Sequence, residues 1–177
     1  MNVPSLHNEE IRLRAPEPAD VEFLYELEND ETLWPLGNTT APFSIYSLKK
    51  YIEENTHDIF LDRQIRFIIE RTDGKELLGT IDLVNFDPLH FRAEVGIAIL
   101  PLWRRKHYAS QAIELLSNYC ERFLHFHQLF ANVPEDNSNS LQLFQKNGFR
   151  QSGILKEWLL AEDKYCDVYF LQKIFKS

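Results

Sequence analysis

The segment that most constrains the fold is residues 91–120, FRAEVGIAILPLWRRKHYASQAIELLSNYC. It begins with an apolar, β-branched run at 95–100, and Pro101 ends that strand because proline cannot donate to a strand ladder. After a basic turn, apolar residues recur every three or four positions, which buries one face of a helix. The segment therefore predicts a strand, a loop and a helix, whose buried face holds Ala109, Ala112, Ile113, Leu116, Tyr119, Cys120 and Phe123.

The turn before this helix carries three fixed positive charges, on Arg104, Arg105 and Lys106, followed by His107. The first backbone N–H groups of a helix have no partner inside the helix, and they point outward at the positive end of its dipole. A phosphate can bind at such a position. The pattern favours an anion site, and a solvated basic turn is the alternative that the segment alone leaves open.

The run from 101 to 109 reads Pro-x-x-Arg-x-x-x-Tyr-Ala. It resembles the acetyl-CoA signature of the GNAT superfamily of N-acetyltransferases, Arg/Gln-x-x-Gly-x-Gly/Ala. Arg104 and Ala109 match it, whereas His107 stands where the family has the middle glycine that lets the backbone approach pyrophosphate. The resemblance implies that acetyl-CoA is the co-substrate and that it contacts Ile97, Ala98, Ile99, Arg104, Arg105, Lys106, His107, Tyr108, Ala109 and Ser110.

A second run, residues 137–149, resembles the family signature Asn-x-x-Ser/Ala-x-x-Leu-Tyr-x-Lys-x-Gly-Phe. A capped amphipathic helix would explain its apolar positions, but not why Asn137 and Ser140 also match. The resemblance implies that Asn137, Ser140 and Phe144 belong to the cofactor site, where the first two face the pantetheine arm across a gap between two strands. Phe144 replaces a tyrosine that protonates the departing thiolate in many relatives. In the ribosomal-protein acetyltransferase branch a serine that matches Ser140 takes this part, so the resemblance makes Ser140 the first candidate for the acid, with Tyr108 and Tyr165 in reserve.

Acetyl transfer to an amine also requires a base, because an alkylamine with a pKa of about 10.4 is mostly protonated at neutral pH. Glu94, in Arg92-Ala-Glu-Val-Gly-Ile, is the candidate, and the alternative is a strand glutamate that faces solvent. In the family, backbone N–H groups around 97–99 hold the thioester carbonyl. Such donors stabilise the negative charge that develops on the oxygen.

The order of predicted elements is β-αα-βββ-α-β-α-ββ, unlike the regular alternation of a doubly wound nucleotide fold. It matches the GNAT order over nearly the whole chain. We therefore expect one domain over 1–177, of class α/β (α+β), with a mixed, mostly antiparallel sheet of about seven strands flanked by about four helices. The predicted strands are 11–14, 65–70, 77–84, 95–100, 129–133, 149–158 and 165–174.

The formal net charge of -8 argues against a nucleic-acid partner and is compatible with a cationic substrate. No apolar run approaches the roughly 20 residues that span a bilayer, and the first ten residues are polar, so we expect a cytoplasmic protein without a membrane partner. Cys120 and Cys166 are expected to be reduced. His125 and His127 lack a third ligand at suitable spacing, and no metal site is predicted.

Short segments around 66–70, 78–79, 92–94 and 165–168 resemble the spermidine/spermine acetyltransferase branch most, with the ribosomal-protein-alanine branch close behind. The acceptor implied is a polyamine-like small amine or a protein N-terminal peptide, and dimers are common in these branches, so a homodimer is a further implied partner. Thr40 and Ala41 stand where the polyamine enzymes carry a glutamate pair, so a polyamine-regulated site of that kind is not expected, which argues against spermidine as the substrate. Because His107 and Phe144 depart from the family at functional positions, the alternative is a catalytically impaired GNAT domain that binds CoA or another ligand as a sensor or interaction module.

Overall fold

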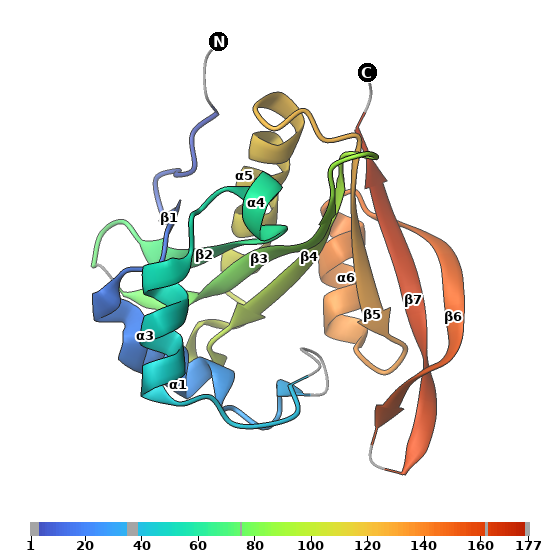
Figure 1. Ribbon diagram of the computed structural model, residues 1–177. Coiled ribbons are helices and arrows are strands. Elements are labelled where there is room, and N and C mark those ends of the chain that lie inside the picture. The colour runs from blue at the N-terminus through green and yellow to red at the C-terminus, as the bar shows by residue number, and fades with distance from the viewer. Residues whose placement is uncertain (1–3, 35–38, 75, 162, 176–177) are drawn as a thin grey trace.

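The computed structural model describes residues 4–34, 39–74, 76–161 and 163–175 (Figure 1). Within these residues one seven-stranded sheet has the order β1-β2-β3-β4-β5-β7-β6. Its strands are β1 (Ile11–Arg14), β2 (Ile65–Arg71), β3 (Leu77–Asp87), β4 (Arg92–Ile99), β5 (Gln128–Pro134), β6 (Arg150–Ala161) and β7 (Lys164–Ile174). The helices are α1 (Val21–Glu28), α3 (Ile45–Glu54), the single turn α4 (Ile59–Asp62), α5 (Tyr108–Arg122) and α6 (Ser138–Lys146), with short 3-10 turns at Pro18–Asp20 and Pro101–Trp103.

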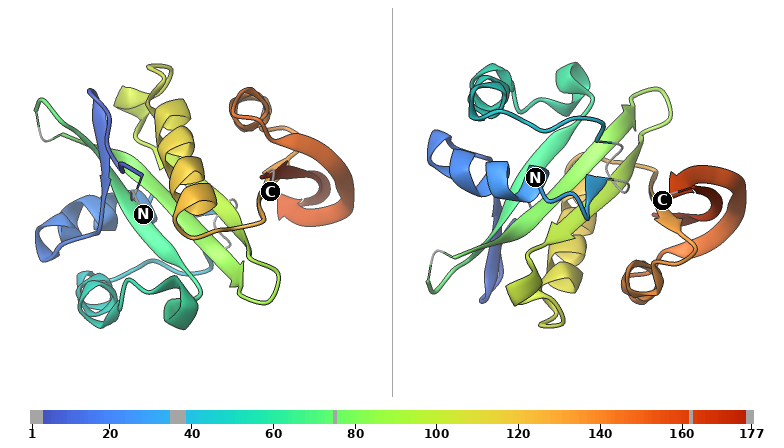
Figure 2. Two further views of the ribbon diagram at one scale, coloured as in Figure 1. Left: turned by 90° about the horizontal axis from the view of Figure 1, so that it is seen from above. Right: turned by 90° about the horizontal axis from the view of Figure 1, so that it is seen from below.

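The helices cover the two faces of the sheet in pairs: α5 and α6 lie on one face, and α1 and α3 on the other (Figures 1 and 2). Each pair has its own core. Ala112, Ile113 and Leu116 of α5 belong to the larger core, together with the inner residues of all strands from β1 to β5. Leu24 of α1, with Leu48 and Ile52 of α3, packs on Ile68 of β2 from the opposite side. The face under α1 and α3 is therefore left partly free toward β4 and β5.

Strand β4 has an incomplete pairing on one side. It pairs antiparallel with β3 along most of its length, but it pairs parallel with β5 only through Arg92, Ala93 and Glu94. Beyond that point β5 continues to pair with β7 as far as Pro134. The two strands therefore diverge after Glu94, and the β5 side of residues 95–99 is an opening in the sheet.

The predicted order of elements is confirmed apart from the single turn α4, which the sequence did not predict, and several helix ends are confirmed as well. Ser44 caps α3 through a 3.0 Å hydrogen bond from the Ser47 N–H. Asn137 caps α6, and Gly148 follows that helix with φ +88°, a conformation that suits glycine. One prediction was wrong: Phe123 is 42% exposed, because α5 ends at Arg122 and Phe123 is already its C-cap.

Candidate active site

Glu94 lies at the point where β4 and β5 separate, and its side chain faces the side of α1 and α3. Both of its carboxylate oxygens accept hydrogen bonds. Asn85, on β3, donates to Oε2 at 2.8 Å, and Asn132, on β5, donates to Oε1 at 2.8 Å. The carboxylate is thus held between the two neighbouring strands, and it does not project freely into solvent.

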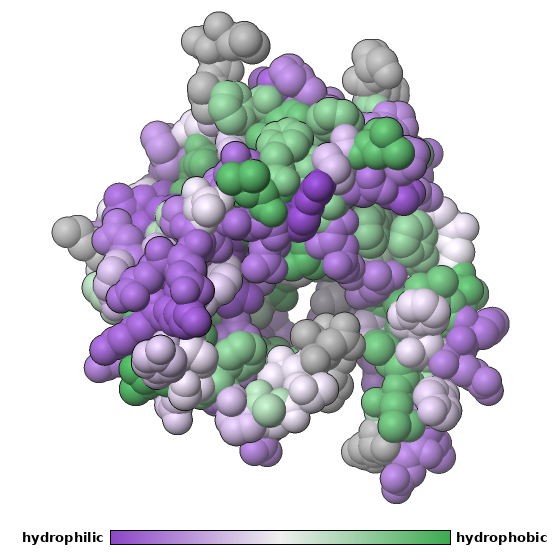
Figure 3. All heavy atoms as spheres, in the orientation of Figure 1, coloured by the Kyte–Doolittle hydropathy of each residue, from purple (hydrophilic) through white to green (hydrophobic). Residues whose placement is uncertain are grey.

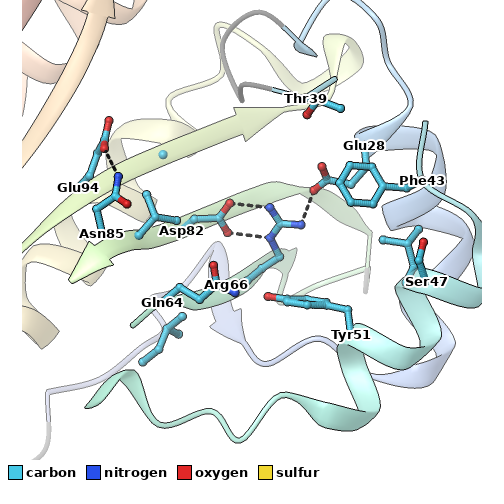
Figure 4. A pocket seen from close by; sticks show the side chains of 14 residues that line it. Glu28, Thr39, Phe43, Ser47, Tyr51, Gln64, Arg66, Asp82, Asn85 and Glu94 are labelled. Atoms are coloured by element: carbon cyan, nitrogen blue, oxygen red, sulfur yellow. Dashed lines mark hydrogen bonds and ion pairs between the residues drawn. The ribbon is translucent and has the colours of Figure 1, made fainter. Parts of the chain in front are cut away.

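A pocket of about 500 Å³ lies in front of β4, between the sheet and α3. In the space-filling view this face is hollowed between the helices and the β6–β7 hairpin (Figure 3). The residues that line the pocket include Glu94 and Gly96 of β4, Asp82 of β3 and Tyr51 of α3 (Figure 4). A smaller adjoining pocket shares Gly96 and Asp82 and extends along β4 to Ala98.

On the floor of the pocket one arginine is paired with two carboxylates. Arg66 donates to both carboxylate oxygens of Asp82, at 2.9 and 2.8 Å, and to Glu28 of α1 (Figure 4). Burial opposes the charge of Arg66, but the two carboxylates outweigh it and raise the pKa of Arg66 above its ordinary value. The Arg66 Cζ atom lies 6.0 Å from the centroid of the Tyr51 ring. Burial raises the pKa of the Tyr51 phenol. The three carboxylates and one guanidinium among the described lining residues leave the pocket negative.

The backbone of β4 offers hydrogen-bond donors to the opening. Leu100 N–H donates to the Leu78 carbonyl at 2.9 Å, so the antiparallel alternation directs N–H groups of even-numbered residues toward β3. The Ala98 N–H is therefore used within the sheet. The N–H groups of Ile97 and Ile99 point the other way, where β5 has already separated. They are placed to hold an oxygen atom in the opening.

The turn that leads into α5 has the geometry of an anion site. Arg105 and His107 adopt left-handed conformations, with φ 62° and 64°. Within the described ranges, the backbone N–H groups of Tyr108, Ala109 and Ser110 donate to no protein acceptor. A pyrophosphate fits these donors, which lie at the positive end of the helix dipole.

The charged side chains of this turn differ in what they contact. Arg104 donates from Nε to the Ile99 carbonyl at 2.9 Å, which ties the turn to the end of β4. Lys106 lies over the Trp103 ring at 4.6 Å. The Ser110 hydroxyl donates to Asn147 at 3.1 Å and so links α5 to the end of α6, whereas the Ser110 backbone N–H donates to no acceptor among the described residues.

Helix α6 places its three predicted residues differently. Asn137 caps the helix by accepting from the Ser140 N–H at 3.1 Å, and the Ser140 hydroxyl makes no hydrogen bond to any described residue. Phe144 is buried, at 4% exposure, and packs edge-on against Phe149 with ring centroids 5.0 Å apart. Its ring belongs to the larger core, whereas Ser140 is half-buried.

Comparison with known proteins decides the family. Residues 10–150 match the family described as the acetyltransferase (GNAT) domain. The chain belongs to the GNAT acetyltransferases. Spermidine N(1)-acetyltransferase of Vibrio cholerae is 27% identical to it over 93% of this chain and 95% of that protein. Ribosomal-protein-serine acetyltransferase of Escherichia coli is 25% identical over 96% of each.

A solved structure extends the likeness to three dimensions. The crystal structure of the Vibrio cholerae spermidine N-acetyltransferase in complex with CoA and spermine superposes on this GNAT chain with a TM-score of 0.85 and 26% sequence identity. The superposition covers 94% of this chain and 96% of that one. The chain is accordingly an N-acetyltransferase with acetyl-CoA as its co-substrate, and the opening beside β4 and the donors of α5 suit that molecule.

The sequence of this GNAT chain did not single out Arg66, Tyr51, Asn85 or Asn132 as residues of the site. Arg66 stands in a strand pattern where a charge usually indicates the surface, and Tyr51 shares the apolar spacing of Leu48 and Ile52, which is typical of a buried helix face. Asn132 carried a signal, since asparagine is depleted in strand interiors. Among the acidic residues of this region, Glu28 and Asp82 line the pocket, while Asp87 pairs with Arg92 outside it.

Two further observations concern ligands and membranes. Among the residues with described positions, no three His, Cys, Asp or Glu side chains are grouped to hold a metal ion. Over the same residues, no helix combines the length and apolar character needed to cross a bilayer.

Proposed function

We propose that this chain transfers the acetyl group of acetyl-CoA to a primary amine of a polyamine such as spermidine or spermine. The observation that carries the proposal is the acidic pocket that ends at Glu94, on the strand that borders the cofactor opening. Its lining includes the carboxylates of Glu28, Asp82 and Glu94 against the single cation of Arg66. A polyamine carries several positive charges at neutral pH, and its hydrocarbon segments suit the apolar walls that Leu48 and Ile65 provide.

The relatives support the same substrate class. Two of the proteins most similar in sequence are named spermidine N(1)-acetyltransferases, from Vibrio cholerae and Escherichia coli. The Vibrio cholerae structure holds CoA together with spermine. A protein N-terminus is the second candidate because of the ribosomal-protein relative. The negative, partly enclosed pocket favours the polyamine, since an N-terminal peptide presents a single ammonium group.

In this proposal the pantetheine arm runs through the opening between β4 and β5, and the N–H groups of Ile97 and Ile99 hold the thioester carbonyl. Glu94 takes the proton of the attacking amine, directly or through one water molecule, as the amine nitrogen bonds to the carbonyl carbon. Collapse of the intermediate breaks the carbon–sulfur bond. Ser140 then donates its hydroxyl proton to the thiolate, which at a pKa of about 8.5 is an undemanding leaving group, and it regains a proton from solvent, to which Glu94 releases the one it took from the amine.

The test is a panel of acceptors assayed by release of the CoA thiol. Spermidine and spermine should give amine-dependent release, and a ribosomal N-terminal peptide should give little. Glu94→Gln, which keeps the size of the side chain, should slow release from spermidine about 100-fold. Release with the peptide alone would replace the polyamine by a protein substrate. Tight CoA binding with no acceptor-dependent release would favour the sensor.

A further inference from the structure

We infer that Asn132 is a positioning residue for Glu94. Its presence in β5 serves the reaction, although it makes the fold less stable than an apolar residue would. The inference rests on the proposed function of Glu94 as the base. It concerns a residue outside both family-like motifs, on a strand that the motifs do not include.

The first observation is the place of Asn132 in the sheet. Phe130 is the last residue of β5 that pairs with β4, opposite Glu94. Asn132 lies two residues further along β5, so the strand period of two puts its side chain on the same face as that of Phe130. Its amide spans the start of the opening and donates to Glu94 Oε1 at 2.8 Å. Only the NH₂ end of the amide can face a carboxylate, which fixes the orientation of the group.

The second observation is the other end of the same amide. The Oδ1 atom of Asn132 is buried and has no hydrogen-bond partner among the residues that the structure describes. A buried polar atom without a partner is unfavourable, and native structures contain few of them. Asparagine is also depleted in strands, where β-branched and aromatic residues pack well. The local preferences of β5 therefore disfavour Asn132, and such conflicts are expected at functional sites.

The third observation is the contrast with Asn85, which holds the other oxygen of Glu94. Asn85 is exposed, at a register shift near the end of β3, and has φ 53°. Water can replace its amide at Oε2. The bond from Asn132 is partly buried and joins the proposed base to the strand on the far side of the opening. Asn132 thus sets the position of the carboxylate relative to the bound thioester. Gln128, also on β5, has a partly buried amide that is hydrogen-bonded to Gln172 and not to Glu94, and it serves as the matched control.

The test uses the whole chain with acetyl-CoA and spermidine. Asn132→Leu, which keeps the branched shape of the side chain, should lower kcat about 10-fold to 100-fold, because a small displacement of a catalytic group has an effect of that size. The KM values for both substrates should change less than about threefold, and the melting temperature should stay equal or rise, since the unpartnered carbonyl is removed. Gln128→Leu, the matched control, should change kcat less than about threefold, because its amide is bonded to Gln172 and not to Glu94. Asn132→Ala provides a second variant if the leucine does not fit.

A double-mutant cycle shows whether Asn132 acts through Glu94. In the Glu94→Gln background, Asn132→Leu should lower kcat little further, because the group it positions is already absent. If the two substitutions lowered kcat by independent factors that multiply in the double variant, the inference would be overturned. It would also be overturned if Asn132→Leu left kcat unchanged while Glu94→Gln lowered it. If Glu94→Gln itself keeps full activity, Glu94 is not the base, and the proposed function of this residue fails. That result differs from the results that would overturn only the role of Asn132.

Discussion

Glu94 of β4 and Asn132 of β5 are joined by a hydrogen bond of 2.8 Å at the point where the two strands stop pairing. The same divergence that opens the sheet for a cofactor thus also fixes the carboxylate that faces the pocket. The amide of Asn132 therefore couples the geometry of the sheet to the position of the proposed base. A change that alters the angle between β4 and β5 should therefore affect turnover more than it affects substrate binding.

The negative pocket should select its substrate by charge. Asp82→Asn removes one of the pocket carboxylates and leaves Arg66 paired with Glu28. We expect the KM for spermidine to rise about 10-fold at low salt, with a smaller difference at high ionic strength because salt screens partly exposed charges. Asp87→Asn, outside the pocket, is the control. An equal rise for both variants would mean that only the overall charge matters.

His107 occupies a left-handed backbone position, with φ 64°, before the first turn of α5. A glycine adopts this conformation without strain, and its missing side chain leaves more room for pyrophosphate. His107→Gly should therefore bind acetyl-CoA several-fold more tightly in a calorimetric titration. His107→Ala should be less stable than His107→Gly, since alanine is strained there. Weaker binding by the glycine variant would show that the imidazole itself is a phosphate ligand.

Two glycines near the pocket should respond differently to a methyl group. A Cβ on Gly79 would lie 2.0 Å from the Ala98 carbonyl oxygen, a backbone atom that cannot move aside. Gly79→Ala should destabilise the fold by more than about 3 kcal/mol, or roughly 6–12 °C in melting temperature. At Gly96 the nearest atom is the Asp82 Cβ at 3.9 Å, so Gly96→Ala should fold normally and raise the KM for the amine. Equal melting temperatures for the two variants would contradict this account.

How far the sequence predicts this molecule differs between the fold and the site. The strand-turn-helix segment and the capped helix α6 could be predicted because their signals are local: apolar spacing, a proline, a cap residue and a glycine after the helix. In the structure that glycine has φ +88°. The pocket could not be predicted from the sequence. Its charged residues Arg66, Asp82 and Glu28 come from three separate elements and meet only in the folded chain, where β2 pairs with β3. Asn132 likewise acquires its meaning only once β5 lies beside Glu94.

Acid should weaken the fold through Glu70, which is buried between Arg12 and Arg14. Burial opposes its ionisation, but hydrogen bonds from both arginines outweigh this and lower the pKa of Glu70. The stability it contributes is complete above the unfolded pKa of about 4.3 and is lost as the pH falls through the lower folded pKa. Melting temperatures should therefore fall below about pH 4, and less steeply in Glu70→Gln. Asp73→Asn, at an exposed pair, should follow the unaltered chain, and identical slopes for all three proteins would exclude Glu70 as a source.

A crystal structure of this chain with CoA and spermine would test the central claim most directly. The account predicts CoA in the opening between β4 and β5, with its phosphates at the N–H groups of Tyr108 and Ala109. It places one spermine nitrogen within about 3.2 Å of the Glu94 carboxylate, or one water molecule away. Spermine bound elsewhere, with the Glu94 pocket empty beside bound CoA, would contradict it.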